Sequence, residues 1–390
     1  MSFTIQSEFN NPSAKYRAIP FWSWNGNLDK EELRKQIDYF KQMGYGGFVI
    51  HPRIGLKEEY LGPLFADCVN YCIDYARKND MYVCLYDEDK WPSGFGAGAV
   101  TKNNPEFRAR ALLVSRKNYP EGYHLTGRKQ RSRMTENGVL GFLSAYVVSL
   151  DENGFLITYR KTDRNDKDAN LFAYEVVTDE LEWFNNSAYA DLLNPEAVKK
   201  FIEVTYEKYR KITGERFGTD AKAIFTDEPQ HAFFNTLKDA SSVEDLILPW
   251  TLNMDKRFGN DMGYSILDKL PEVIWNTSNP VSQVRFHFYL WINREFSNSY
   301  FKTLWNWCRD NGIMFTGHLL KEESLTSLSQ CSGDAMMHYS SFDIPGLDIL
   351  ADRREFQSAK QVQGIKNQYG KDPVNIDKYE ACILQTEDSH

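Results

Sequence analysis

Three consecutive acidic residues, Asp87, Glu88 and Asp89, follow the apolar run 81–85 and come just before Trp91 in a Trp-Pro-Ser-Gly sequence. An apolar run of this length predicts a buried strand, so the acids stand where a strand ends. Adjacent carboxylates repel one another, and a cation, an arginine or a bound polyol would relieve that repulsion. A solvated loop or a helix cap is the alternative, because charged runs usually face water. The bulky Trp-Pro sequence favours a rigid loop instead.

A second acidic pair, Asp227 and Glu228, precedes Pro229 at the end of the apolar run 222–226. Successive side chains of a strand point in opposite directions, so only one of the two acids faces a substrate. We expect Glu228 to be catalytic because its longer side chain reaches further, with Asp227 beside the substrate. Capping of the next helix is the alternative role for such acids. A protonated carboxyl and a second carboxylate are the groups that glycoside hydrolysis requires.

Other polar and aromatic residues also fall where strands are predicted to end. The carboxyl ends of parallel barrel strands meet at one face, where active sites lie. A single histidine or tryptophan more often has a structural role. What indicates a site is that such residues occur at the ends of several predicted strands. The predicted substrate-binding residues, besides Asp87, Asp89 and Asp227, are Trp22, Trp24, His51, Arg53, Trp91, His318 and His338.

The elements that would position these residues alternate between strands and amphipathic helices. Asp29 with Glu32 forms a capping box, and Asn194 before a proline marks another helix start. This order predicts an α/β protein, a (β/α)8 TIM-type barrel, in which an eighth strand is not apparent. The predicted strands are 18–24, 45–50, 81–86, 222–226, 314–318, 334–339 and 373–376, and a helix is expected over 353–369.

Residues 108–185 interrupt this repetition. Their apolar residues alternate along the chain, and an Asp-Glu-Asn-Gly turn at 151–154 separates two such runs. This pattern predicts an antiparallel β-hairpin insertion after the third strand. Because no linker or low-complexity segment divides the chain, we expect residues 1–390 to form a single barrel domain.

Composition restricts the classes of ligand. The formal net charge is −8 and there is no basic stripe, which argues against nucleic acid. Aromatic residues make up 14% of the chain and suit a small carbohydrate. No apolar run has membrane-spanning length, no signal peptide is apparent, and the six cysteines form no CxxC pair, so a cytoplasmic protein is expected.

Six motifs, in order, give the chain a family resemblance. They are PFWSWNG (20–26), GGFVIHPRIGL (46–56), YLGPLF (60–65), YDEDKWPSGF (86–95), FTDEP (225–229) and TGHLL (316–320). Over about 20–369 the sequence resembles the catalytic barrel of glycoside hydrolase family 106, the α-L-rhamnosidases. The resemblance implies an inverting mechanism with two carboxylates and a calcium ion near the sugar hydroxyls. It does not identify the calcium ligands, and no organic cofactor is expected.

Carried over to this sequence, the glutamate of the Asp-Glu-Pro motif is Glu228. The family's second catalytic glutamate falls on Asp377, one methylene shorter, and a following Gly-Trp is absent. The partner of Glu228 is therefore expected to be Asp377 or a member of the acidic triplet, Glu88 above all.

The expected activity is inverting cleavage of a terminal deoxysugar from an oligosaccharide or glycoside. The first alternative is a catalytically impaired carbohydrate-binding barrel or fragment. The second is a metal-dependent hydrolase or isomerase that uses His51, His318, His338 and Asp87, because histidines at several strand ends can bind a transition metal.

Overall fold

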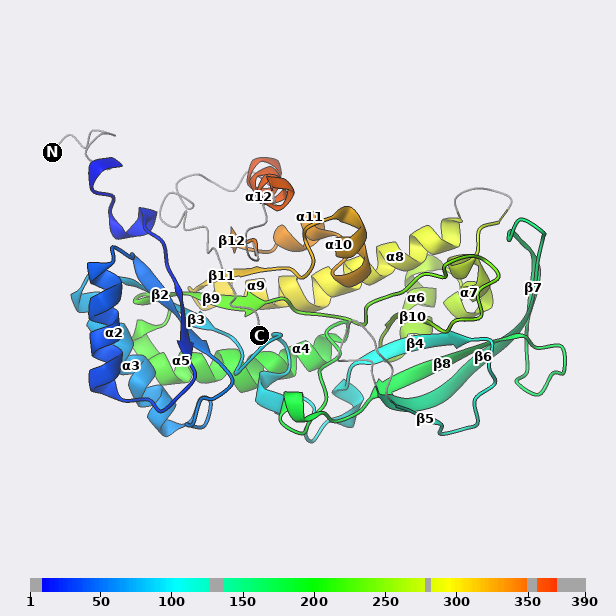
Figure 1. The fold of residues 1–390 in the computed structure, drawn as a ribbon, viewed down its shortest axis with the longest axis horizontal. Coiled ribbons are helices and arrows are strands. Elements are labelled where there is room, and N and C mark those ends of the chain that lie inside the picture. The colour runs from blue at the N-terminus through cyan, green and yellow to red at the C-terminus, as the bar shows by residue number, and fades with distance from the viewer. Residues whose placement is uncertain (1–8, 127–136, 278–281, 349–355, 370–390) are drawn as a thin grey trace.

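The computed structural model describes residues 9–126, 137–277, 282–348 and 356–369 and has a parallel and an antiparallel half (Figure 1). In the parallel half, six strands form one sheet in the order β1-β2-β3-β9-β11-β12. The first five correspond to the predicted strands 18–24, 45–50, 81–86, 222–226 and 314–318. Their bounds are β1 (Phe21–Trp24), β2 (Gly47–Pro52), β3 (Tyr82–Tyr86), β9 (Ala221–Asp227), β11 (Met314–His318) and β12 (Ile344–Pro345).

Helices begin at the predicted caps. The side chain of Asp29 accepts a hydrogen bond from the Glu32 amide, and Asn194 precedes Pro195 at the first helical position. None of the helices in the described segments is long and apolar enough to cross a membrane. The helices are α2 (Lys30–Gln42), α3 (Pro63–Lys78), α4 (Pro195–Phe201), α5 (Glu207–Thr213), α6 (Met254–Met262), α7 (Ile266–Ile274), α8 (Gln283–Phe296), α9 (Lys302–Asp310), α10 (Leu325–Cys331), α11 (Ala335–Tyr339) and α12 (Phe356–Gln368).

Two of the long helices contain a turn of π-helix. Residues Ile202–Tyr206 (η6) join α4 to α5, and Ser297–Phe301 (η8) join α8 to α9. Each π turn carries a buried tyrosine: the Tyr206 hydroxyl bonds to Asp87, just after β3, and the Tyr300 hydroxyl bonds to Thr226 of β9. Such turns often occur at functional sites.

The predicted hairpin insertion is part of a larger antiparallel sheet. Its strands run in the order β10-β4-β8-β6-β5, and β7 pairs with β6. The edge strand of this sheet, β10, lies about 70 residues after β8 in the sequence. Its second half falls in a stretch, from residue 248 on, for which the sequence pattern predicts mainly helix. The bounds are β4 (Arg110–Ser115), β5 (His124–Leu125), β6 (Gly138–Leu150), β7 (Leu156–Thr162), β8 (Leu171–Thr178) and β10 (Leu246–Trp250).

The structure differs from the prediction after β11. Residues 334–339 form α11 instead of a strand, because Asp334 caps the amide of Met337 and starts a helix. The two-residue strand β12 follows, while the predicted strand 373–376 lies outside the described residues. Since no pairing joins β12 to β1 in the described part of the chain, the fold is a mixed α/β fold with a six-stranded parallel sheet, and closure into an eight-stranded barrel is not shown.

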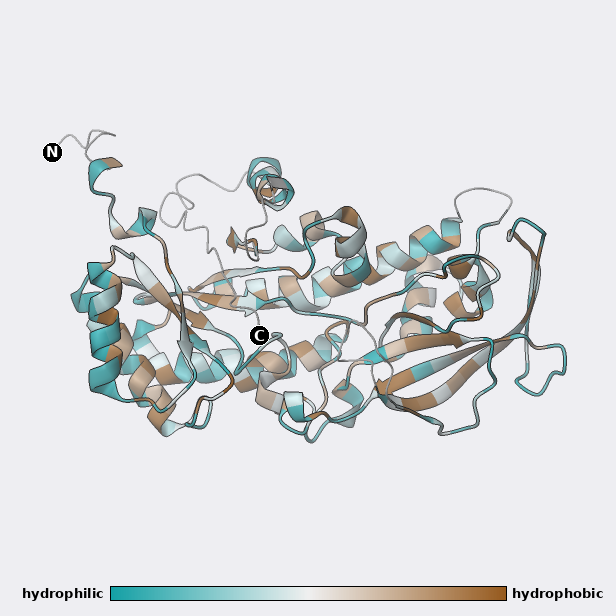
Figure 2. Cartoon of the chain, viewed as in Figure 1, coloured by the Kyte–Doolittle hydropathy of each residue, from teal (hydrophilic) through white to brown (hydrophobic). Residues whose placement is uncertain are grey.

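The parallel sheet has two apolar faces. The outer face packs against the helices through a large cluster that includes Trp22, Trp24 and Phe65, and the inner face holds a small cluster around Tyr86 and Phe225. Figure 2 shows brown hydrophobic segments along the strands and teal segments on α2, which flanks the sheet. Strand alternation therefore decides which residues can reach the interior.

We predict that Gly317→Ala destabilises the fold by about 3 kcal/mol or more. Gly317 has φ +152°, and an added Cβ would lie 2.1 Å from the carbonyl oxygen of Thr226 on β9. The matched control is Gly141→Ala in β6, where no atom lies within 4 Å of the added Cβ. Urea unfolding of both variants measures the difference, and equal midpoints would contradict the prediction.

Candidate active site

Four polar side chains lie on the inner face at the carboxyl ends of adjacent strands. They are His51 of β2, Tyr86 of β3, Asp227 of β9 and His318 of β11, and all are buried. The Cα atoms of His318 and Asp227 are direct partners across the two strands. The sequence predicts three of these four residues, and the strand order brings them together.

Asp227 is the centre of this group. Its Oδ1 lies 2.9 Å from Nε2 of His318, and its Oδ2 accepts a 2.6 Å hydrogen bond from the Tyr86 hydroxyl. Burial alone would raise the pKa of Asp227, but His318 and Tyr86 hold it below its usual value. Burial lowers the pKa of His318, but the Asp227 carboxylate outweighs this and raises it to about 10. The pair is therefore ionised at neutral pH.

His51 is buried, with 1% of its surface exposed, and packs with its ring centre 4.0 Å from that of Tyr86. Neither ring nitrogen has a hydrogen-bond partner among the described residues. Burial lowers its pKa to about 3, so the imidazole is neutral and offers one donor and one acceptor. Arg53, two residues later, adds a positive charge that also lowers the pKa of His51.

Glu228 leaves the end of β9 in a strained conformation, with φ +45°. Its Oε2 accepts a 2.7 Å hydrogen bond from Nε1 of Trp91, and its amide donates to the carbonyl of His318. Burial, Asp227 and Asp348 raise the pKa of Glu228 well above its usual value. The raised pKa favours the protonated form of this carboxyl, which is the form that a general acid needs.

Asp348 is a site residue that the sequence analysis missed. One ligand atom from each of Glu228, His318 and Asp348 lies within 4.8 Å of the others. The only sequence signal is an acid after the short Ile-Pro strand, β12. Glu322 lies behind it: its carboxylate accepts hydrogen bonds from the Tyr339 hydroxyl and the Asp348 amide, and burial raises its pKa to about 7.

Most oxygens of the acidic triplet accept hydrogen bonds from the protein, but Oδ1 of Asp89 has no partner among the described residues. Asp87 points to the outer side, where its carboxylate accepts hydrogen bonds of 2.5 and 2.8 Å from Ser93 and Tyr206, and burial raises its pKa to about 7. Asp89 accepts a 2.9 Å hydrogen bond from Asn185. These contacts, those of Glu88, and the ammonium of Lys90 3.7 Å from Oδ2 of Asp89 offset the repulsion between the three carboxylates.

Glu88 is fully occupied by backbone amides. Its two oxygens accept hydrogen bonds from the amide of Asp89 and from the amides of residues 94–97, at 2.6 to 3.3 Å. Burial and Asp89 raise the pKa of Glu88, while the amide donors lower it. With both oxygens committed to this loop, Glu88 is placed to hold the backbone rather than to exchange a proton with a substrate.

Besides Asp87 and Asp89, three predicted substrate-binding residues lie away from the inner face. Trp22 and Trp24 alternate to the outer face of β1, where Trp22 donates to Gln36 and Trp24 packs 5.4 Å from Phe65. His338 is on α11, and its Nε2 contacts the carbonyl of Ser332. The structure therefore does not bring these three into the site, and Asp377 lies outside the described residues.

The described residues do not fit calcium well. Calcium takes six to eight oxygen ligands, whereas the triplet's oxygens are largely occupied and the Glu228, His318 and Asp348 cluster includes an imidazole. One imidazole and two carboxylates suit a transition metal better. The set of His51, His318, His338 and Asp87 is not assembled, because His338 and Asp87 face other surroundings.

Comparisons with known proteins give the fold. No protein-family model and no curated protein matches the chain. A solved rhamnosidase from Novosphingobium sp. PP1Y is similar with a TM-score of 0.58 and 13% identity, over 95% of this chain and 52% of that one. A trehalulose synthase (TM-score 0.37, 9% identity, 91% of this chain and 56% of that one) and an isomaltulose synthase from Klebsiella sp. LX3 (0.33, 10%, 94% and 56%) also match. The chain thus shares its fold with a glycoside hydrolase and spans about half the length of these structures.

We predict that Glu88→Ala lowers the free energy of unfolding by at least about 3 kcal/mol, because it leaves several buried amides without an acceptor. Asp89→Ala is the matched control. It should lower the free energy of unfolding far less, because the Asp89 carboxylate has fewer partners and is 15% exposed. Chemical denaturation measures both. Similar losses for the two variants would contradict the role of Glu88 as the anchor of loop 94–97.

Proposed function

We propose that this protein hydrolyses a glycosidic bond, with Glu228 as the general acid. The observation that carries the proposal is a buried carboxyl whose pKa is raised by burial and by two neighbouring carboxylates, at the carboxyl end of a parallel strand. Such a group gives its proton to the departing oxygen of a sugar. The shared fold with a rhamnosidase is consistent with this chemistry.

Asp348 has a supporting role in this proposal. Its negative charge keeps the proton on Glu228 until the glycosidic oxygen receives it. The two carboxylates lie within 4.8 Å, which is closer than the 6.5–9.5 Å that leaves room for a water in inverting enzymes. Asp348 is therefore not the base that activates water in an inverting reaction. Asp377 remains the predicted base of that mechanism.

The inner face would hold the sugar. His51 offers hydroxyl groups two ring nitrogens that no described residue contacts by a hydrogen bond, and the ionised Asp227 and His318 form the wall beside it. Trp91 holds the Glu228 carboxyl in one orientation through its indole N–H. The family resemblance of the six motifs makes an α-L-rhamnoside the first substrate to test.

A metal-dependent hydrolase is the second candidate, favoured by the cluster of Glu228, His318 and Asp348. Metal analysis of protein purified without added metal separates the two candidates. Stoichiometric zinc or another transition metal that is lost in His318→Gln supports the second; metal-free protein with full glycosidase activity supports the first.

We predict that Glu228→Gln lowers kcat for an aryl α-L-rhamnoside by about 100- to 10,000-fold, because the general acid is lost. The control is Glu203→Gln on η6, a carboxylate that is 67% exposed, and it should keep full activity. Initial rates with both purified variants measure the effect. Equal rates for Glu228→Gln and wild type would remove Glu228 from the mechanism.

We predict that Asp348→Asn moves the basic limb of the pH–rate profile to lower pH. A general acid works only while protonated, so activity falls as the pH rises through its pKa. Removing the neighbouring negative charge lowers that pKa. Profiles of kcat/KM for wild type, Asp348→Asn and the Glu203→Gln control test this. An unmoved or upward-shifted limb would refute the role of Asp348.

A further inference from the structure

Two adjoining hollows lie between the antiparallel sheet and the helices around α8. The first, of about 420 Å³, lies between the hairpin tip at Gly154, β10 and helices α7 and α8. The second, of about 350 Å³, lies between α8 and the α10–α11 region. Phe234 and Tyr289 line both, so the two hollows are neighbours on either side of these two side chains, and together they are named the groove.

Aromatic side chains make the walls of this groove. Phe234 and Tyr289 pack with ring centres 4.9 Å apart at the junction of the hollows, and Phe155 at the hairpin tip is 38% exposed. The negatively charged face of an aromatic ring attracts weakly positive C–H groups. Sugar rings present such C–H groups on one face and hydroxyls at their edges. The walls therefore match a carbohydrate chain.

One buried hydrogen-bonding group in the groove is unused. Nε2 of the buried His231 has no partner among the described residues, while its Nδ1 bonds to the Ala232 carbonyl. Tyr289 adds a phenol side chain to both hollows. Asn235 and Asn276 line the first hollow but are already engaged, by Asp245 and Ile247 and by Arg285 respectively. Neutral donors and acceptors of this kind suit hydroxyl groups.

The charges along the groove argue against an anionic ligand. Arg285 lines the first hollow, but its guanidinium bonds to the carbonyl of Val273 and to Asn276, both at 2.7 Å. Asp239 lines that hollow and Asp334 the second. A phosphate or nucleic acid needs surplus cations, which this groove does not have.

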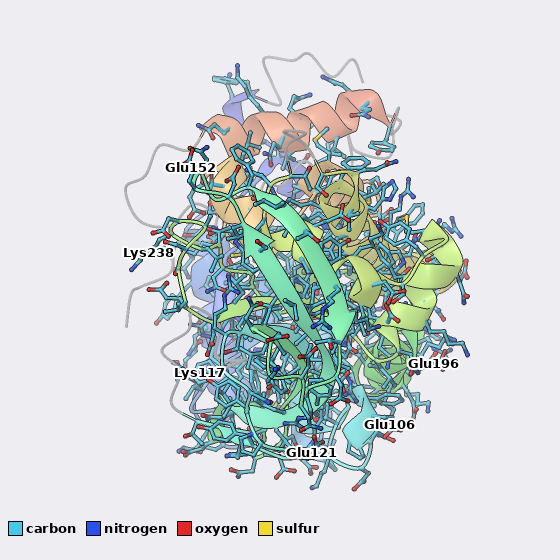
Figure 3. The ribbon with its side chains drawn as sticks, turned by 90° about the vertical axis from the view of Figure 1, so that its right-hand side faces the viewer. Glu106, Lys117, Glu121, Glu152, Glu196 and Lys238 are labelled. Atoms are coloured by element: carbon cyan, nitrogen blue, oxygen red, sulfur yellow. The ribbon has the colours of Figure 1, made fainter. Side chains whose placement is uncertain are left out.

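One chain segment joins the groove to the proposed general acid. Residues 228–237 begin with Glu228 and then line the second hollow with His231 and both hollows with Phe234. Three residues span at most about 10 Å, so the Cα of His231 lies within about 10 Å of the Cα of Glu228. Figure 3 shows the labelled Glu152 and Lys238 toward the same edge of the antiparallel half, where Gly154 meets Ala240 at the far end of the groove.

We infer that this groove binds the part of an oligosaccharide that extends beyond the cleaved bond. The inference rests on the proposed function and narrows its substrate to an extended, neutral glycan in preference to a single sugar on a small aglycone. The aromatic walls would hold the sugar faces, while Tyr289 and His231 would bind the hydroxyl edges.

The kinetic test compares an aryl α-L-rhamnoside with a tetrasaccharide that ends in α-L-rhamnose. Tyr289→Ala should lower kcat/KM at least tenfold for the tetrasaccharide and leave the aryl glycoside unchanged. Tyr289→Phe keeps the aromatic ring and removes only the hydroxyl, so its kcat/KM for the tetrasaccharide should fall less than that of Tyr289→Ala. Phe286→Ala, 59% exposed on the same helix and outside the groove, is the control and should change neither rate. Equal losses on both substrates would overturn the inference.

A binding test separates this inference from the proposed function. Calorimetry measures the affinity of the tetrasaccharide for Glu228→Gln, with and without Tyr289→Ala or Phe286→Ala. A tenfold weaker affinity caused by Tyr289→Ala alone supports the groove, even if wild type fails to cleave either substrate and the hydrolase proposal falls. Unchanged affinity in the correctly folded Tyr289→Ala variant overturns the groove, whether or not Glu228 proves to be the acid.

Discussion

The ion pair between Asp227 and His318 is the interaction on which the site depends. A buried carboxylate is costly unless its charge is compensated, and here one imidazole and one phenol hydroxyl provide the compensation. These partners come from β11 and β3, the two strands that flank β9 in the sheet. The charge thus holds three strand ends in one arrangement and sets the electrostatic environment of Glu228.

A second set of contacts connects the acidic triplet to the carboxyl group of Glu228. Glu88 fixes the amides of residues 94–97, and Ser93 ties the loop to β9 by accepting from the Asp227 amide and donating to Asp87. This loop presents Trp91, whose indole N–H holds Glu228. The triplet therefore influences the site through the backbone, without facing the substrate.

Much of the parallel half could be predicted from the sequence, because apolar runs, caps and strand-end acids are local signals. The side on which a residue lies depends on the strand register: Trp22 and Trp24 lie within a correctly predicted strand, yet alternation directs their side chains to the helices. Asp348 was missed because a two-residue strand gives no periodic signal. Residues 334–339 were misassigned as a strand, since a short apolar run does not distinguish helix from strand.

The π turns of the two long helices make the protein sensitive to insertion or deletion of a residue within those helices. A π turn holds one residue more than the α-helical turn it replaces, and each residue of an α-helix rotates the chain by about 100°. Loss of one residue in η6 or η8 would restore a regular helix and rotate the surface beyond it. Tyr206 and Tyr300 would then leave Asp87 and Thr226. We therefore expect helix length at these two points to be more tightly constrained than residue identity along the exposed faces.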